Sequence, residues 1–354
     1  MEHFRRTKAV INLGAITRNT QILLRRYPDY DHYTAVVKAD CYGYRGNQVV
    51  EAMLAGGADS LACSLLEEGI ALRTAFPNTP ILLFTPIEKD LLDECVRHKL
   101  IATVCNQCQA EDAAKIADLN VMVRANGGSD IFGGPTDRDS FHALYHTLNN
   151  GKCRLAGIYL HSYNAEDAKE TESEYRTFEN MASGLDLSEL EYVSISNSLT
   201  LPRYQKKSYA NTCRLGNIIY GIETENAGLE ETFRLESVVH TIFHLPKGRS
   251  VAYGRAYTAQ TDNEFIAAVP IGFGDGFSKT NIGRKVYIND REYPIVAVTM
   301  DITHIRVDET IRSGDTVVLI RDNHHLEEIS AHIHGATEEP ICALNKRVYR
   351  EYIK

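Results

Sequence analysis

The first part of the chain alternates short apolar runs with amphipathic segments. Eight of the runs are rich in apolar and β-branched residues and have the length of a buried strand. They span Tyr33–Val37, Ser60–Cys63, Ile81–Phe84, Ile101–Val104, Val121–Arg124, Leu155–Leu160, Tyr192–Ile195 and Tyr209–Arg214. Helical patterns lie between them, for example over Glu67–Arg73, Asp90–His98, Gln107–Ala117, Asp139–Leu148 and Ser173–Ala182. This alternation predicts an α/β fold, with a parallel (β/α)8 barrel of the TIM type over residues 14–226.

An open, doubly wound sheet is the alternative for the same alternation. A dinucleotide-binding sheet of that kind carries G-x-G-x-x-G after its first strand. No such motif follows the first strand here, which favours the barrel.

The pattern changes after about Gly228. Short β patterns separated by Gly, Asn and Asp turns replace the helical segments. They cover Val238–Leu245, Ser250–Thr261, Phe265–Pro270, Lys285–Ile288, Glu292–Met300, His304–Val307 and Thr316–Ile320, and Asn345–Lys354 closes the chain. We therefore predict a second, all-β domain over residues 227–354.

Composition and charge narrow the class of protein. The 354 residues include 44% hydrophobic and 24% charged residues, which is ordinary for a soluble protein of two domains. The net charge of −9 argues against nucleic acid and anionic membranes as partners. We expect no membrane segment and no secretory leader, and the eight scattered cysteines indicate a reducing, cytoplasmic location. Cys105 and Cys108 form a lone CxxC, which we interpret as ordinary thiols and not as a metal site.

Lys38 is the first candidate for chemistry. It stands at the carboxyl end of the apolar run that starts at Thr34, and Asp40–Gly43 then gives a turn signal before a helical pattern over Gln48–Gly56. Enzymes with parallel sheets place reactive groups at this end of a strand. A lysine that extends to solvent from the strand end is the alternative.

The residues around Lys38 resemble the lysine motif of the alanine racemase family, which typically reads V-V-K-A-N-A-Y-G-H-G. Here Lys38, Tyr42 and Gly43 match, whereas Asp40, Cys41, Tyr44 and Arg45 depart from the motif. The stretch Gly57–Arg73 resembles the second barrel strand and helix of that family. The resemblance implies pyridoxal 5'-phosphate (PLP) as cofactor, bound by Lys38, and a head-to-tail homodimer. It also implies that residues 1–13 join the β domain.

Two further motifs resemble the parts of the family that bind the cofactor's phosphate. Ser194–Thr200 looks like its N-S turn, and Arg214–Ile222 looks like its R-P-G-x-x-x-Y-G. The implied cofactor residues are Tyr42, His161, Asn197, Ser198, Arg214, Gly216, Asn217 and Tyr220. For Asn197 and Ser198 alone, a helix cap is the alternative.

Arg214 would face the pyridine nitrogen of the cofactor. A guanidinium stays charged and would keep that nitrogen unprotonated, which favours proton transfer over decarboxylation. On its own, Arg214 could also be a surface residue at a strand end.

Tyr253 looks like the second catalytic base of the family, whose motif is x-S/G-Y-G-x-x-Y/W. The resemblance implies that it enters the site from the other subunit, opposite Lys38. Removing a proton on one face of Cα and returning it on the other inverts the centre, so racemisation needs two bases. His161 matches the histidine that hydrogen-bonds this tyrosine, although a lone histidine at a strand end is also often structural.

The implied substrate contacts lie mostly in the β domain. Ile271–Phe277 resembles the family's I-G-Y-A-D-G turn, and Thr299–Asp301 resembles its C-M-D. The Met300 amide would hold the substrate carboxylate across the dimer interface, and Asp301 would line the same site.

The match fails at two places that bear on the substrate. The family has an arginine shortly after the position of Arg124, and in this chain Ser129 or Ile131 stands in its place. In the same motif, Met122 replaces a lysine of the family. Arg124 could supply the missing charge. Near the C-terminus, Lys346, or Asn345 if there is a gap, replaces a tyrosine that narrows the alanine pocket, so we expect a substrate contact at Asn345.

The sequence thus predicts a PLP-dependent amino-acid racemase. Alanine is the default substrate, and serine or a larger amino acid is possible. A decarboxylase or aldolase on the same fold, or a PLP-binding regulatory protein with little turnover, are the alternatives.

Overall fold

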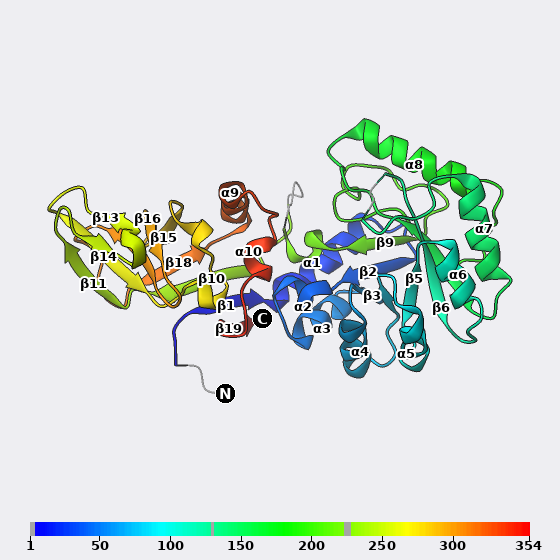
Figure 1. The fold of residues 1–354 in the computed structure, drawn as a ribbon, viewed down its shortest axis with the longest axis horizontal. Coiled ribbons are helices and arrows are strands. Elements are labelled where there is room, and N and C mark those ends of the chain that lie inside the picture. The colour runs from blue at the N-terminus through cyan, green and yellow to red at the C-terminus, as the bar shows by residue number, and fades with distance from the viewer. Residues whose placement is uncertain (1–3, 129–130, 223–227) are drawn as a thin grey trace.

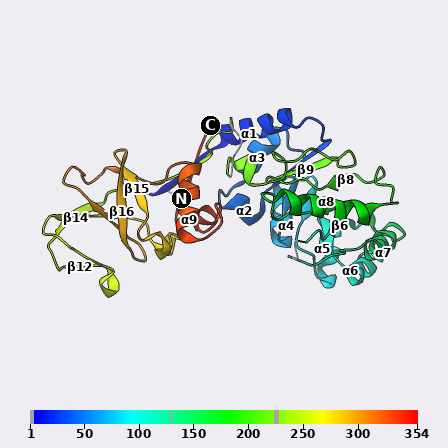
Figure 2. The ribbon, with the colours of Figure 1, turned by 90° about the horizontal axis from the view of Figure 1, so that it is seen from above.

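The computed structural model describes residues 4–128, 131–222 and 228–354. The chain forms a parallel barrel and a β domain, which lie at opposite ends of the long axis in Figure 1. Figure 2 shows the same two parts from above, with α9 between them. In the described part of the chain, no helix combines the length and apolar character needed to span a bilayer.

The barrel sheet has the predicted strands. They are β2 (His32–Val36), β3 (Ser60–Cys63), β4 (Ile81–Leu83), β5 (Ile101–Val104), β6 (Asn120–Ala125), β7 (Arg154–Leu160), β8 (Tyr192–Ser194) and β9 (Thr212–Leu215). They pair in parallel in the order β8-β7-β6-β5-β4-β3-β2-β9. A parallel bridge between Ser196 and Cys213 brings β8 next to β9 and closes the ring. The predicted α/β barrel is confirmed, and the near-continuous burial of its strands explains their unbroken apolar runs.

Helices cover the outside of the barrel. They are α1 (Leu13–Arg26), α3 (Asn47–Ala55), α4 (Leu66–Ala75), η1 (Lys89–Leu91), α5 (Leu92–Arg97), α6 (Gln107–Ala113), α7 (Arg138–Asn149), α8 (Ala168–Ala182) and η2 (Asn217–Tyr220). Helix α8 begins earlier than predicted, because the Asp167 carboxylate caps it by accepting from the Lys169 and Glu170 amides. Between Ser194 and Thr212, all of which are described, the chain makes turns and no helix.

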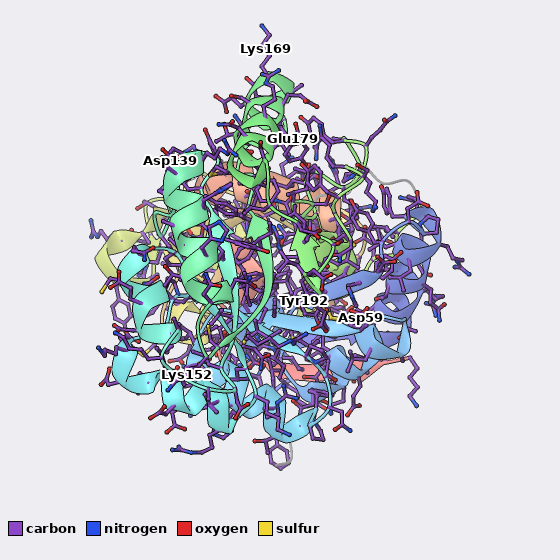
Figure 3. All side chains as sticks on the ribbon, turned by 90° about the vertical axis from the view of Figure 1, so that its right-hand side faces the viewer. Asp59, Asp139, Lys152, Lys169, Glu179 and Tyr192 are labelled. Carbon is purple, nitrogen blue, oxygen red and sulfur yellow. The ribbon has the colours of Figure 1, made fainter. Side chains whose placement is uncertain are left out.

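Figure 3 views the barrel from the side away from the β domain. Asp59, Lys152 and Tyr192 lie where β3, β7 and β8 begin. Lys169 and Glu179 lie on α8 at the outside. The carboxyl ends of the barrel strands therefore point toward the β domain.

The β domain is built on a nine-stranded sheet. Its strands are β1 (Lys8–Asn12), β10 (Phe233–Val238), β11 (Thr241–Leu245), β14 (Glu264–Val269), β15 (Lys285–Ile288), β16 (Arg291–Val298), β17 (Thr303–Val307), β18 (Thr316–Ile320) and β19 (Tyr349–Ile353). β1 pairs with β10 and β19, as expected for the first residues of the chain. The exact boundary at residues 226 and 227 stays a prediction, because 223–227 lie outside the described residues.

Some β patterns break where the sequence predicted continuous strands. Ser250–Thr261 forms a small hairpin of β12 (Ser250–Val251) and β13 (Tyr257–Thr258), joined by η3 (Tyr253–Arg255). Two further short turns are η4 (Phe273–Asp275) and η5 (Lys279–Asn281). Helices α9 (Asn323–Ile333) and α10 (Glu339–Cys342) connect β18 to β19, where no helix was predicted.

His325 on α9 gives the β domain a predicted pH dependence. The ring is buried, its Nδ1 accepts from the Arg321 amide at 3.2 Å, and Nε2 donates to the Lys285 carbonyl at 3.3 Å. Burial, and then the charge of Arg284, lower the pKa of His325 from 6.5 to about 4.

The unfolded chain therefore takes up a proton near pH 6.5 that the folded chain does not take until about pH 4. We expect this histidine's contribution to the free energy of unfolding to be complete above pH 6.5. It should fall by up to about 1.4 kcal/mol per pH unit between pH 6.5 and 4. Urea unfolding across this range should show a shallower loss for His325→Gln, with exposed His324→Gln as the control. Equal slopes for wild type and His325→Gln would contradict this.

Candidate active site

Lys38 stands at the carboxyl end of β2, where it begins the short segment α2 (Lys38–Tyr42). Ala39, Asp40 and Cys41 have φ of 52–57° and ψ of 44–57°, so α2 is a left-handed turn. That conformation costs roughly 1–2 kcal/mol per residue outside glycine. The sequence predicted a turn here but not its handedness.

Contacts from both domains hold this turn. The Ala39 amide donates to Glu68 Oε1 at 2.7 Å. Gly43 has φ of 78° and lies so close to α10 that a Cβ there would be 2.4 Å from the Ile341 carbonyl oxygen. The Arg350 guanidinium donates to the Gly43 carbonyl at 2.9 Å. The conformation next to Lys38 is thus fixed by distant segments of the chain.

A cavity of about 370 Å³ opens at Lys38. Most of the residues that the sequence assigned to the cofactor line it. They are Lys38, Tyr42, His161, Asn197, Ser198, Arg214, Gly216 and Asn217, with the substrate candidate Arg124 beside them. Strand ends far apart in the sequence therefore meet in one place, as parallel strands allow.

One end of the cavity has the form of a cradle for an anion. The Gly216 amide donates to Ser198 Oγ at 2.7 Å. A Cβ on Gly216 would lie 3.0 Å from Tyr42 Oη and 3.2 Å from Ser198 Oγ. Two hydroxyl groups thus converge on a space that a single methyl group would enter, and the Gly216 amide is paired with one of them.

Two of the predicted cofactor residues support this cradle. Tyr220 does not line the cavity; its hydroxyl donates to the Val36 carbonyl at 3.0 Å and its ring packs on Tyr42. Asn197 Oδ1 accepts from the Leu199 and Thr200 amides at 3.0 and 3.1 Å, which is a cap-like turn. Asn197 also lines the cavity, and among the described residues up to β9 no helix follows it, so the helix-cap alternative is wrong and the role toward the cofactor stays a prediction.

Arg214 lies inside the barrel, almost fully buried. Its guanidinium donates to the Ser194 carbonyl and hydroxyl at 3.0 and 2.6 Å, and to the Leu160 carbonyl at 2.7 Å. Burial lowers the pKa of Arg214 to about 10, so it stays charged at neutral pH. It is therefore a fixed cation and not a surface residue.

His161 follows β7 and opens onto the cavity. Surrounding protein, and then the charges of Arg214, Arg124 and Lys38, lower its pKa to about 3. The ring is accessible from the cavity but faces cations within it, so it remains neutral across the physiological range. A neutral imidazole can accept a hydrogen bond from a hydroxyl group.

Arg124 comes from the end of β6 and is 3% exposed. It donates to the Gly133 carbonyl at 3.2 Å, and its guanidinium lies 5.5 Å from the centre of the Phe132 ring. Met122 lies two residues earlier on the same strand, so its side chain is on the same face as that of Arg124, and it is also buried. Ile131 lines the cavity and is 61% exposed, whereas Ser129 lies outside the described residues.

The remaining predicted residues do not reach this cavity within one chain. Tyr253 is 88% exposed and Met300 is 55% exposed. Figure 2 shows β12, which ends two residues before Tyr253, at the end of the β domain away from the barrel. The side chain of Asn345 is occupied by the Gly274 carbonyl and the Arg347 amide, at 2.8 and 2.9 Å.

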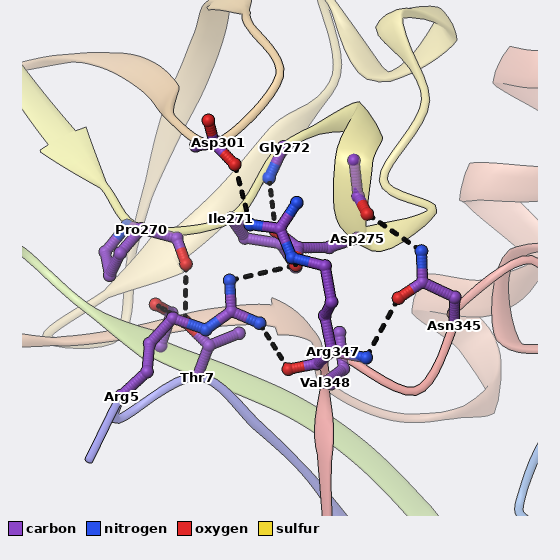
Figure 4. A network of polar contacts seen from close by, with 12 residues as sticks. Arg5, Thr7, Pro270, Ile271, Gly272, Asp275, Asp301, Asn345, Arg347 and Val348 are labelled. Atoms are coloured by element: carbon purple, nitrogen blue, oxygen red, sulfur yellow. Dashed lines mark hydrogen bonds and ion pairs between the residues drawn. The ribbon is translucent and has the colours of Figure 1, made fainter. Parts of the chain in front are cut away.

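A polar network holds the turn that carries Met300 and Asp301 (Figure 4). Asp275 is fully buried and pairs with Arg5 at 2.9 Å and Arg347 at 3.2 Å. Arg347 also pairs with Asp301 at 2.6 Å. The network fixes this turn on the surface of the β domain.

Several cavity residues were not identified from the sequence. Ser64 and Phe84 directly follow β3 and β4, so the strand-end argument that found Lys38 could have found them. Glu338 comes from the β domain, next to α10, and its carboxylate accepts from Asn217 Nδ2 at 3.3 Å. Nothing in the sequence indicates that Glu338 approaches the barrel. The described residues contain no group of three or more metal-ligating side chains.

Family models cover nearly the whole chain. One described as alanine racemase, N-terminal domain, matches residues 11–224, and one described as alanine racemase, C-terminal domain, matches residues 232–352. An alanine racemase of Halalkalibacterium halodurans is 28% identical over all of this chain and 97% of its own length.

Solved structures share the fold. The alanine racemase from E. faecalis superposes with a TM-score of 0.90 at 27% identity, covering 99% of this chain and 98% of that one. A histidine racemase from Leuconostoc mesenteroides has a TM-score of 0.86 at 18% identity, covering 100% and 99%. At that identity the second likeness extends to the fold alone.

Proposed function

The chain belongs to the alanine racemase family and is an isomerase, and from this premise we propose that it racemises a small amino acid with PLP. L-alanine is the default substrate and serine is the first alternative. The observation that carries the proposal is the cavity at Lys38, where one amine, a buried cation and an anion cradle face the same space.

The residues present fit PLP. The hydroxyl groups of Tyr42 and Ser198 would donate to a phosphate, and the Gly216 amide, which donates to Ser198 Oγ, would orient the Ser198 hydroxyl. The absence of a side chain at Gly216 leaves room for the phosphate between the two hydroxyl groups. Lys38 would supply the amine that reacts with the cofactor's aldehyde, and Arg214 would supply a fixed positive charge near the pyridine ring. When bound, PLP would supply the electron sink that makes the Cα proton removable.

The chain's own groups would then move the proton. Lys38 Nζ and the hydroxyl oxygen of Tyr253 from a partner protomer would face Cα from opposite sides, so that one takes the proton and the other returns it. The neutral His161 ring would accept a hydrogen bond from the Tyr253 hydroxyl. The exposure of Tyr253 within one chain supports a role across a head-to-tail dimer.

Arg124, Met300 and Asp301 remain the proposed substrate contacts. Arg124 would offer its charge to the substrate carboxylate, and Met300 and Asp301 would approach from the partner. A substrate contact by Asn345 would have to replace the hydrogen bonds of its side chain to the Gly274 carbonyl and the Arg347 amide.

The test is exchange of the Cα proton in heavy water. The protein loaded with PLP would be given L-alanine, L-serine and a panel of other L-amino acids, and NMR would follow loss of the Cα proton. Exchange with accumulation of the D-form supports the proposal and identifies the substrate. Bound PLP without exchange for any amino acid would contradict it and favour a binding protein.

Replacing Gly216 by alanine tests the anion cradle. The added methyl group would enter the space between Tyr42 Oη and Ser198 Oγ. Losing one charge-assisted contact of about 1.5–3 kcal/mol should weaken PLP binding roughly 10- to 150-fold. Absorbance titration measures this, and pyridoxal, which lacks the phosphate, is the control ligand. Equal weakening for both ligands would mean that the cradle does not hold the phosphate.

A further inference from the structure

The residue before Tyr253 has an unusual backbone conformation. Ala252 has φ of 64° and ψ of 175°. This region is essentially reserved for glycine, since a Cβ collides there with the neighbouring backbone. Such strain persists only where the surrounding structure imposes it, and it gathers at functional sites.

Packing and pairing on both sides impose this conformation. Ala252 packs against a small apolar cluster that contains Leu245, Val251 and Ile266. The hairpin beneath it is held by the pair Val251–Tyr257. The Tyr257 hydroxyl in turn donates to the carboxylate of Glu264, a residue that is 6% exposed.

The backbone conformation of Ala252 determines the direction of the chain at Tyr253. Turning Ala252 to an ordinary negative φ would rotate the following chain about its N–Cα bond and would pull the methyl group out of the cluster. Gly254 and Arg255 also have positive φ, of 67° and 57°, so the chain turns sharply on both sides of Tyr253. Between these turns the Tyr253 side chain is exposed to solvent within one chain.

We propose that Ala252 is a positioning residue: its glycine-like backbone conformation, held by the hairpin around it, aims Tyr253 at the Lys38 cavity of a second copy of this chain. The proposal rests on the proposed function, because it assumes that Tyr253 acts in the partner's cavity. Beyond the proposed function, it assigns to Ala252 the role of fixing the direction of Tyr253.

The test compares two substitutions at Ala252 in the holoenzyme. Valine is far less compatible with this conformation, so Ala252→Val should lower kcat about 10- to 100-fold and change KM much less, as expected for a misplaced base. Ala252→Gly adopts the conformation without strain and should keep most of the activity. Ala256→Val is the matched control, since Ala256 is exposed in the same loop with an ordinary φ of −53°.

Three outcomes would overturn the proposal. They are a normal kcat for a folded Ala252→Val protein, equal losses for the valine and glycine variants, and an equal loss for Ala256→Val. Thermal unfolding of each variant separates these results from a general loss of folding.

Hybrid dimers separate this proposal from the proposed function. In a dimer of one Lys38→Ala chain and one Tyr253→Phe chain, the intact cavity takes its tyrosine from the Lys38→Ala chain. Adding Ala252→Val to that chain should lower hybrid activity about 10- to 100-fold, and adding it to the other chain should not. Equal effects from both placements would overturn the positioning role alone. Hybrids without any activity, even with Ala252 intact, would overturn the shared site and this inference with it.

Discussion

Replacing Lys38 by alanine is expected to abolish racemisation and the visible absorbance of the PLP-loaded protein. Among the described residues that line the cavity, Lys38 is the one lysine. The variant loses both the attachment of the cofactor and one of the two proposed bases. General acid–base contributions alone are typically worth about 10²–10⁴-fold in rate.

Borohydride reduction followed by mass spectrometry is the measurement for Lys38. In the wild type, the cofactor's mass should be found on the peptide that contains Lys38. In Lys38→Ala, Tyr42, Ser198 and Gly216 remain, so PLP should still bind but be lost on dialysis. Lys89→Ala, at an exposed lysine, is the control. Labelling of a different lysine in the wild type would show that the assignment is wrong.

Mixing two inactive variants is expected to restore activity. Lys38→Ala and Tyr253→Phe each remove one proposed base, so each homodimer should be nearly inactive. If the cavity is completed by the partner's tyrosine, a hybrid dimer contains one cavity with both bases and one with neither. Random assembly makes half of the dimers hybrids, so about a quarter of the wild-type activity should return.

Co-expression with two different affinity tags allows the hybrid dimer to be purified. The activity of the hybrid should be about half that of the wild type per dimer. If Tyr253 acted in its own chain, neither chain of the hybrid would carry both bases and no activity would return. Dimers of two differently tagged Lys38→Ala chains control for the tags.

If the Tyr253 turn of one chain completes the Lys38 cavity of the other, catalysis would require the dimer. The Met300 turn is fixed by the Asp275 and Arg347 network, and the Tyr253 turn is fixed by the cluster beneath Ala252. Both turns lie on the β domain, outside the cavity of their own chain. We expect them to be rigid before assembly, so that little ordering is needed when two chains associate.

The sequence by itself determined the barrel, the position of Lys38 and most of the cavity. Unbroken apolar runs predict buried parallel strands, and the carboxyl ends of such strands meet, so local patterns were sufficient to single out Lys38, whereas the role of Arg214 was implied only by the family resemblance. Ser198 and Gly216 were found through short motifs that resemble those of the family, and the structure places both at the cavity.

Only the tertiary structure decided the features that depend on contacts between distant segments. The left-handed turn after Lys38 is held by α10 and Arg350, about 300 residues further along the chain. Glu338 reaches the cavity from the other domain, and Tyr220 supports Tyr42 from behind instead of lining the cavity. The backbone of Ala252 could not be predicted either, since alanine prefers a negative φ unless packing around it imposes another conformation.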